Sequence, residues 1–176
     1  FLAALRCGGP AAAGQMGLAI SLAQTLSVVF TPAVGVLHSR VGQLHGEGRL
    51  AEVPPLLERA FLVLGLLLVP SVVFLVVDAR AIFGAWVGGS LDAATLMQLA
   101  ATTRLLFVGH AFYIAALPLY YALLGVGEHR VFGLGMLGIA VLNTLLGWLA
   151  TSVSPRIETL AAVYGLLMLA LAAGVT

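Results

Sequence analysis

Long, uniformly apolar stretches separated by short polar segments make up almost the whole chain. They do not alternate apolar and polar residues as the strands of a membrane β-barrel do, which favours helices. Most are close to the roughly 20 residues that a helix needs to cross a bilayer. We therefore predict an all-α, polytopic transmembrane helix bundle with about five spans. The expected spans of this single domain, residues 1–176, are 10–37, 60–77, 96–124, 131–151 and 159–176.

The longest polar segment, residues 38–59, separates the first two expected spans. It combines charged residues with Gly46, Gly48 and the pair Pro54-Pro55, so we expect a loop followed by a short amphipathic helix. Pro32 and Pro70 fall inside the first and second spans. Because proline removes a backbone hydrogen bond, a kink is expected at each of them.

The chain has no lysine, so arginines account for all eight lysine and arginine charges. Segments 38–59 and 127–130 lie on one side of the predicted topology and carry more arginines than the other side. The first group is Arg40, Arg49, Arg59 and Arg130, and the second is Arg6, Arg80 and Arg156. Because cytoplasmic loops carry an excess of basic residues, this bias predicts a cytoplasmic location for segment 38–59.

The composition agrees with a membrane environment: 61% of residues are hydrophobic and 9% are charged, whereas a soluble domain is about a quarter charged. Membrane lipid is therefore the expected surroundings. A net charge of +1 without a basic stripe argues against a nucleic-acid partner. Phe1 lies within an apolar stretch and the chain ends abruptly at Thr176, so we expect a piece of a longer protein.

Few motifs indicate chemistry. Gly133, Gly135 and Gly138 match the dinucleotide-binding fingerprint as a string, but they lie inside an apolar span rather than between a strand and a helix. Small residues that let helices approach closely explain them better. The absence of lysine excludes a P-loop, and the sequence has neither a metal-type cluster nor a nucleophile–base pair. We expect no enzyme activity, no cofactor and no metal.

Arg104 is the most informative single residue. It lies about 12 Å into the third span, at 1.5 Å per residue. A charge at that depth costs about 3 kcal/mol or more unless it faces protein or water. One interpretation is an aqueous cavity in which Arg104 attracts an anionic substrate. The other is that Arg104 extends to the membrane surface or pairs with a carboxylate elsewhere in the protein.

Four further residues complete the set of candidates for a substrate cavity. His110 and Tyr113 belong to a polar and aromatic face of the third span that also carries Tyr120 and Tyr121. This face could contact a sugar, but helix packing and interface anchoring are favoured. Asn143 lies in the middle of the fourth span, where an interhelical hydrogen bond is the commoner role. Gln24 lies on the polar side of the first span.

The order of these elements resembles a known family. A proline-bearing span is followed by the arginine-containing loop 38–59 and by a second proline-bearing span that ends in Phe83-Gly-Ala-Trp-Val-Gly88. The third span ends in the turn Leu123-x-Gly-x-Gly-x-x-Arg130. Over residues 32–150 this resembles the C-terminal half of O-antigen and lipid-linked oligosaccharide flippases, in the multidrug/oligosaccharidyl-lipid/polysaccharide flippase superfamily.

The resemblance implies most of one lobe, of about six helices, in a two-lobe transporter. Such a protein translocates a lipid-linked oligosaccharide or polysaccharide precursor, as in lipopolysaccharide synthesis, across the inner (cytoplasmic) membrane by alternating access. The implied partners are the lipid-linked glycan and the remaining N-terminal half of the transporter, with Arg104 receiving the pyrophosphate. A drug/cation antiporter of the same superfamily and a non-transporting membrane subunit are the alternatives. The antiporter requires an acidic residue deep in a span, and Asp78 is expected near a helix end.

Overall fold

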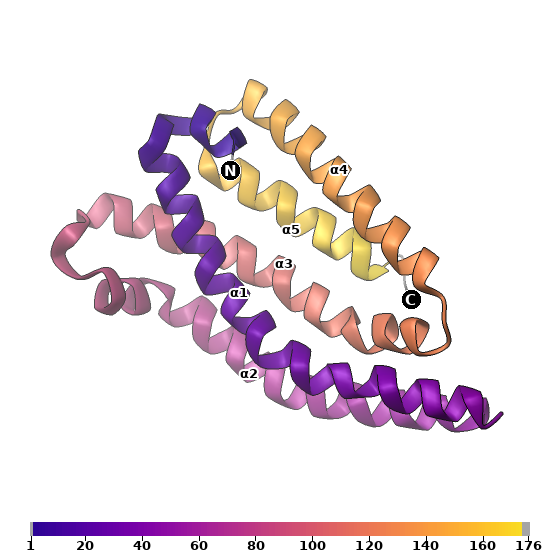
Figure 1. Cartoon of the computed structure of the whole chain (residues 1–176). Coiled ribbons are helices and arrows are strands. Elements are labelled where there is room, and N and C mark those ends of the chain that lie inside the picture. The colour runs from indigo at the N-terminus through magenta and orange to yellow at the C-terminus, as the bar shows by residue number, and fades with distance from the viewer. Residues whose placement is uncertain (1, 174–176) are drawn as a thin grey trace.

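The computed structural model describes residues 2–173, and all regular structure in that range is helical (Figure 1). This confirms the predicted all-α bundle. The elements are α1 (Leu2–Gly46), η1 (Leu50–Glu52), α2 (Val53–Val87), η2 (Gly88–Ser90), α3 (Ala93–Gly125), α4 (His129–Val153) and α5 (Ile157–Ala173).

Four segments are long and apolar enough to cross a membrane: Ala3–Gly46, Leu50–Val87, Ala93–Gly125 and Gly133–Val153. The chain is therefore a multi-pass membrane protein. The fifth expected span, 159–176, corresponds to α5, which has 17 residues and is shorter than the other four. Residues 174–176 of that span lie outside the described residues.

The predicted loop 38–59 is wrong in its extent, because α1 continues to Gly46 and α2 begins at Val53. Apolar side chains explain the longer helix: Leu37, Val41 and Leu44 are buried at helical spacing, while the charged residues of this segment are exposed. Pro54 and Pro55 lie in the first turn of α2. Backbone N–H groups in a first turn have no acceptor within the helix, so proline is tolerated there. The chain reverses at Gly48, whose φ of 72° favours glycine.

The break in α1 lies at a pair of glycines. Backbone dihedrals leave helical values at Gly8 (φ 170°, ψ 26°) and Gly9 (φ 70°, ψ −153°), and Figure 1 shows the first turns of α1 folded over against the rest of the helix. Pro32 and Pro70 lie inside α1 and α2 without such an interruption. The break at Gly8 and Gly9 was not expected, and the kinks expected at Pro32 and Pro70 stay predictions.

Helix α3 is the centre of the bundle and contacts each of the other four α-helices. Two glycines permit these contacts. A Cβ added to Gly109 would lie 2.5 Å from the Cα of Gly165 in α5, and one added to Gly125 would lie 2.8 Å from the Cβ of Val41 in α1. Gly133, Gly135 and Gly138 of α4 have no such neighbour within 4 Å among the described residues, so their predicted role in close helix packing is wrong within this chain.

The two arginine-bearing turns lie at the same end of the bundle, as the topology predicted. A Cβ on Gly42 of α1 would be 3.4 Å from the carbonyl oxygen of Gly125, which ends α3. At the other end, the guanidinium of Arg6 lies 4.3 Å from the ring centroid of Trp148 and donates to Ser152 at 3.3 Å. The assignment of the end with the two arginine-bearing turns to the cytoplasmic side stays a prediction.

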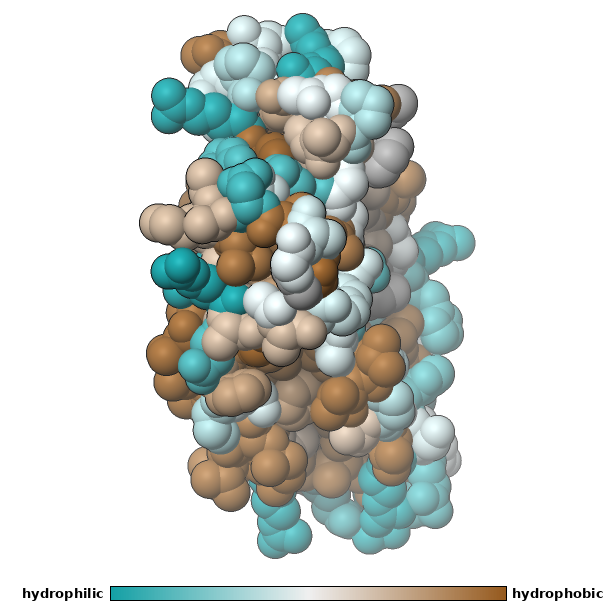
Figure 2. Space-filling view, turned by 90° about the vertical axis from the view of Figure 1, so that its left-hand side faces the viewer, coloured by the Kyte–Doolittle hydropathy of each residue, from teal (hydrophilic) through white to brown (hydrophobic). Residues whose placement is uncertain are grey.

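The outer faces of α2 and α4 are strongly apolar. Leu62, Leu66, Leu137 and Leu145 are each at least 60% exposed. A soluble monomer rarely exposes such continuous apolar surface, whereas lipid or a neighbouring membrane segment covers it at little cost. Figure 2 views the bundle from the side on which α2 joins α3, where hydrophilic side chains are interspersed among hydrophobic ones.

Candidate functional site: an interhelical cavity and a buried histidine–tyrosine pair

A cavity of about 400 Å³ lies between the N-terminal part of α1, the second half of α4 and α5. Most of its wall is apolar, from residues such as Met16 and Leu160. Its polar and aromatic lining comes from Asn143, Thr144, Trp148 and Tyr164. The Thr144 hydroxyl donates to the carbonyl of Ala140 in its own helix at 2.9 Å. The amide of Asn143 and the hydroxyl of Tyr164 are therefore the groups best suited to orient a ligand. The volume lies within the roughly 300–1,000 Å³ typical of small-molecule sites.

His110 of α3 meets this cavity through Tyr164 of α5. The imidazole Nδ1 and the Tyr164 hydroxyl are 3.2 Å apart, and the two rings stack with centroids 5.6 Å apart. His110 is 6% exposed. Tyr113 meets the same imidazole edge-on at a centroid distance of 6.3 Å. The structure thus connects three elements: α3 supplies His110 and Tyr113, α5 supplies Tyr164, and α4 supplies Asn143 to the cavity that Tyr164 lines.

The close crossing of α3 and α5 positions this pair. Gly109 and Gly165 are in contact through their backbones, and they are the immediate neighbours of His110 and Tyr164. Without the two glycines the helix axes could not approach closely enough for the rings to stack. Tyr164 was not among the candidates predicted from the sequence. The signal that could have found it is a tyrosine beside a glycine in a span that is otherwise almost wholly apolar.

Arg104 lies elsewhere, on a surface shared by α2 and α3. Its side chain is exposed, and its Nε donates to the carbonyl oxygen of Val76 in α2 at 2.8 Å. Val76 is about 15 Å along α2 from Trp86, an exposed tryptophan of the kind that marks the membrane interface. Arg104 therefore lies inside a candidate membrane span, outside the cavity lined by Tyr164.

Asp78 lies inside α2, about 13 Å from the end of this helix at Val87. The sequence placed it near a helix end because Asp78 and Arg80 closed the expected span 60–77. Helix α2 continues beyond these charges because Ala79 and Phe83 are both fully buried on one face. The Asp78 carboxylate thus lies in the same candidate span as Val76, whose carbonyl accepts from Arg104.

The remaining candidates do not join the cavity. Gln24 is exposed on α1, and the neighbouring Thr25 hydroxyl donates to the Ser21 carbonyl at 3.2 Å. Tyr120 is buried, and the ring of Tyr121 lies 3.9 Å from the position of a Cβ on Gly35 of α1. Both tyrosines thus take part in helix packing, and their role as interface anchors stays a prediction. Among the described residues, no group of three or more His, Cys, Asp or Glu side chains is arranged to hold a metal ion.

Taken together, the helices and their exposed apolar faces define a polytopic helical membrane protein with an interhelical cavity next to a His–Tyr contact and an exposed arginine inside a candidate span. No protein-family model, curated protein or solved structure matches this chain.

Proposed function

We propose that the chain is part of a membrane transporter that moves a lipid-linked oligosaccharide or polysaccharide precursor across the cytoplasmic membrane by alternating access. The observation that carries the proposal is the position of Arg104, which is exposed inside a candidate membrane span and bonded to the Val76 carbonyl of a neighbouring helix. An arginine that faced hydrocarbon at this depth would cost about 3 kcal/mol or more.

The contact with Val76 argues against an arginine that extends to the membrane surface. Its Nε is held at the level of the Val76 carbonyl, about 15 Å from Trp86 along α2. The surface around Arg104 is then covered by water or by another protein segment. The terminal N–H groups of the guanidinium form a planar fork that matches phosphate oxygens. A cavity between this lobe and the remaining N-terminal half would bring a pyrophosphate to this side chain.

The cavity between α1, α4 and α5 supports a glycan substrate as a secondary observation. Asn143 and Tyr164 present an amide and a hydroxyl, and Trp148 presents an aromatic ring. These groups offer hydrogen bonds and a flat apolar surface, the combination found in ligand pockets with a few orienting polar groups. The cavity and Arg104 lie in different parts of the molecule, so we assign the phosphate to Arg104 and only sugar contacts to the cavity.

The test uses the intact parent protein in vesicles with a fluorescent lipid-linked glycan. Arg104→Ala should reduce translocation about tenfold or more, as expected for the loss of a hydrogen bond from a charged donor to the substrate. Arg104→Lys should keep part of the activity, because it keeps the charge and loses the planar fork. Arg80→Ala, an exposed arginine in the same region, is the matched control and should transport normally. Unchanged translocation by Arg104→Ala at normal expression would remove the phosphate role and overturn the proposal.

Asp78 favours a second candidate, a cation-coupled antiporter, because its carboxylate lies inside α2. This function predicts that Asp78→Asn abolishes proton- or sodium-driven drug efflux from vesicles. Efflux of cationic dyes that depends on Asp78, together with glycan translocation that does not depend on Arg104, would favour the antiporter.

A further inference from the structure

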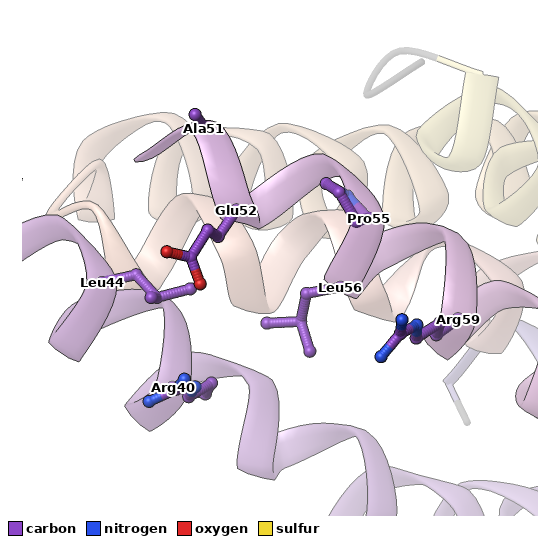
Figure 3. Close-up of a pocket in the computed structure, with 7 residues that line it drawn as sticks. All are labelled: Arg40, Leu44, Ala51, Glu52, Pro55, Leu56 and Arg59. Atoms are coloured by element: carbon purple, nitrogen blue, oxygen red, sulfur yellow. The ribbon is translucent and has the colours of Figure 1, made fainter. Parts of the chain in front are cut away.

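A hollow of about 300 Å³ lies at the turn between α1 and α2 (Figure 3). Arg40 enters its wall from α1, and Arg59 enters from α2. Leu56 lies between the two arginines, and Glu52 of η1 forms part of the far wall. The hollow is at the end of two candidate membrane spans, where lipid headgroups would surround it.

The charges of the hollow favour an anion. Its one carboxylate, Glu52, already accepts from Arg49 through both oxygens, at 2.7 Å from Nε and 3.0 Å from Nη2. Glu47 pairs with the same Arg49 at 2.7 Å, and its hydrogen bonds with Arg49 and Gln43 lower the pKa of its carboxyl. Every ion pair recorded among the described residues thus uses Arg49. Arg40 donates to the neutral amide of Gln43 at 2.6 Å. Neither Arg40 nor Arg59 takes part in the recorded ion pairs, so the positive charges of both are available to a ligand.

An apolar groove of about 310 Å³ continues from this hollow between α1 and α2. The two share Leu56 and Arg59, so they form one continuous surface. The groove extends to Leu67, about 12 Å further along α2 than Arg59. Apart from Arg59, its wall is apolar and includes Val34, Leu37 and Val63.

We propose that this site binds an anionic glycerophospholipid, with the headgroup phosphate in the hollow, in contact with Arg40 and Arg59, and one acyl chain in the groove between α1 and α2. The hollow with its two arginines matches the phosphate of such a lipid, and the apolar groove matches an acyl chain. The groove leads from the end of the two spans toward their middle, as an acyl chain does. Guanidinium groups pair with phosphate oxygens through parallel N–H donors, and basic pockets between membrane helices bind acidic lipid headgroups. The site is independent of Arg104 and of any transported substrate.

The test reconstitutes the full chain in phosphatidylcholine bilayers that contain spin-labelled phosphatidylglycerol or spin-labelled phosphatidylcholine. The motionally restricted fraction of the label measures association with the protein. Phosphatidylglycerol should associate more strongly than phosphatidylcholine, on the order of fivefold, and Arg40→Gln with Arg59→Gln should remove that preference. Arg80→Gln with Arg130→Gln is the matched control and should keep it. Equal association of both lipids with the unaltered chain, or an unchanged preference in Arg40→Gln/Arg59→Gln, would overturn the proposal.

A second pair of variants tests the acyl-chain groove. Val63 lines the groove and is 59% exposed, whereas Val69 is 62% exposed on α2 and is not part of the groove lining. Val63→Trp should fill the groove and reduce the restricted fraction of phosphatidylglycerol, and Val69→Trp should not. The same reduction in both variants would show that the groove is not the chain site. Restriction of spin-labelled polyprenyl phosphate without restriction of phosphatidylglycerol would also contradict the proposed occupant.

Discussion

Helices α3 and α4 have nearly the same hydropathy but different surroundings. Over the most apolar stretch of each, 56% of the α3 residues are buried inside the chain, against 6% of the α4 residues. Helix α3 contacts all four other α-helices, whereas α4 packs mainly against α5. Overall apolarity therefore places a segment in the membrane, but it does not indicate whether the neighbour is protein or lipid. Small residues at points of contact and buried polar side chains make that distinction.

The glycines of the two helices show the difference most clearly. Gly109 of α3 lies against the backbone of Gly165, whereas Gly138 of α4 has open space around it within the described structure. Gly109→Ala should destabilise the bundle by about 1–3 kcal/mol, because a methyl group would force two backbones apart. Gly138→Ala should be neutral or slightly stabilising, because alanine favours the helix.

Unfolding in a lipid–detergent mixture, followed by circular dichroism, measures both changes. Equal stability of the two alanine variants would mean that α3 and α5 do not cross at Gly109, and the contrast between the helices would fail.

For polar side-chain contacts, the difference in stability effects between α3 and α4 should be smaller. Tyr164→Phe removes the hydroxyl that lies 3.2 Å from Nδ1 of His110, and it should cost about 1 kcal/mol. A double-mutant cycle with His110→Phe should give a coupling of about 0.6 kcal/mol or more, as for hydrogen bonds between membrane helices. Thr144→Val on α4 is the control, because among the described residues the recorded bond of the Thr144 hydroxyl lies within its own helix. Additive effects at His110 and Tyr164 would rule out the hydrogen bond.

The smallest contrast concerns the starts of the two helices. Asp92 caps α3 by accepting from the backbone N–H and the hydroxyl of Thr95, at 2.9 and 2.8 Å. Glu128 precedes α4 without a side-chain cap bond. Asp92→Ala should therefore lower the melting temperature at neutral pH, whereas Glu128→Ala should leave it nearly unchanged.

The effect of Asp92 should depend on pH. The hydrogen bonds from Thr95 lower the pKa of the Asp92 carboxyl, so the folded state favours the charged form. The stabilisation is complete above the unfolded pKa of about 3.9 and is lost as the pH falls through the lower folded pKa. The difference in melting temperature between the unaltered chain and Asp92→Ala should shrink from about pH 4 downwards. A constant difference from pH 7 to pH 3 would exclude the charged cap.

The sequence allowed the helical class, four of the spans and the grouping of the arginine-bearing turns to be predicted, because these depend on composition along the chain. The length of α1 and α2 was missed. Charged residues such as Arg40 suggested a loop, but they lie on the outer face of a helix whose inner face is held by Val41 and Leu44. Charge density alone cannot separate a loop from an amphipathic helix end.

The candidate site was predicted only in part. His110, Tyr113 and Asn143 were chosen as polar groups in apolar spans, and the structure brings all three near Tyr164. Tyr164 was missed because its contact with His110 depends on a crossing of helices 54 residues apart in the chain. Gln24 and Arg104 were chosen by the same criterion and lie on exposed surfaces instead. Polarity in a span thus indicates a residue that needs a partner, while the fold decides which partner it has.

The surroundings of Arg104 can be measured directly. Cys7 is the only cysteine of the chain, so Cys7→Ala provides a background for single cysteines at Arg104 and at Leu145, which is 60% exposed on the apolar face of α4. In its membrane, Arg104→Cys should react with a charged, water-soluble thiol reagent, and on the proposed function lipid-linked glycan should slow the reaction. Leu145→Cys should not react. An Arg104→Cys variant as inert as Leu145→Cys would place this position in lipid or dry protein and contradict a water-filled transport cavity.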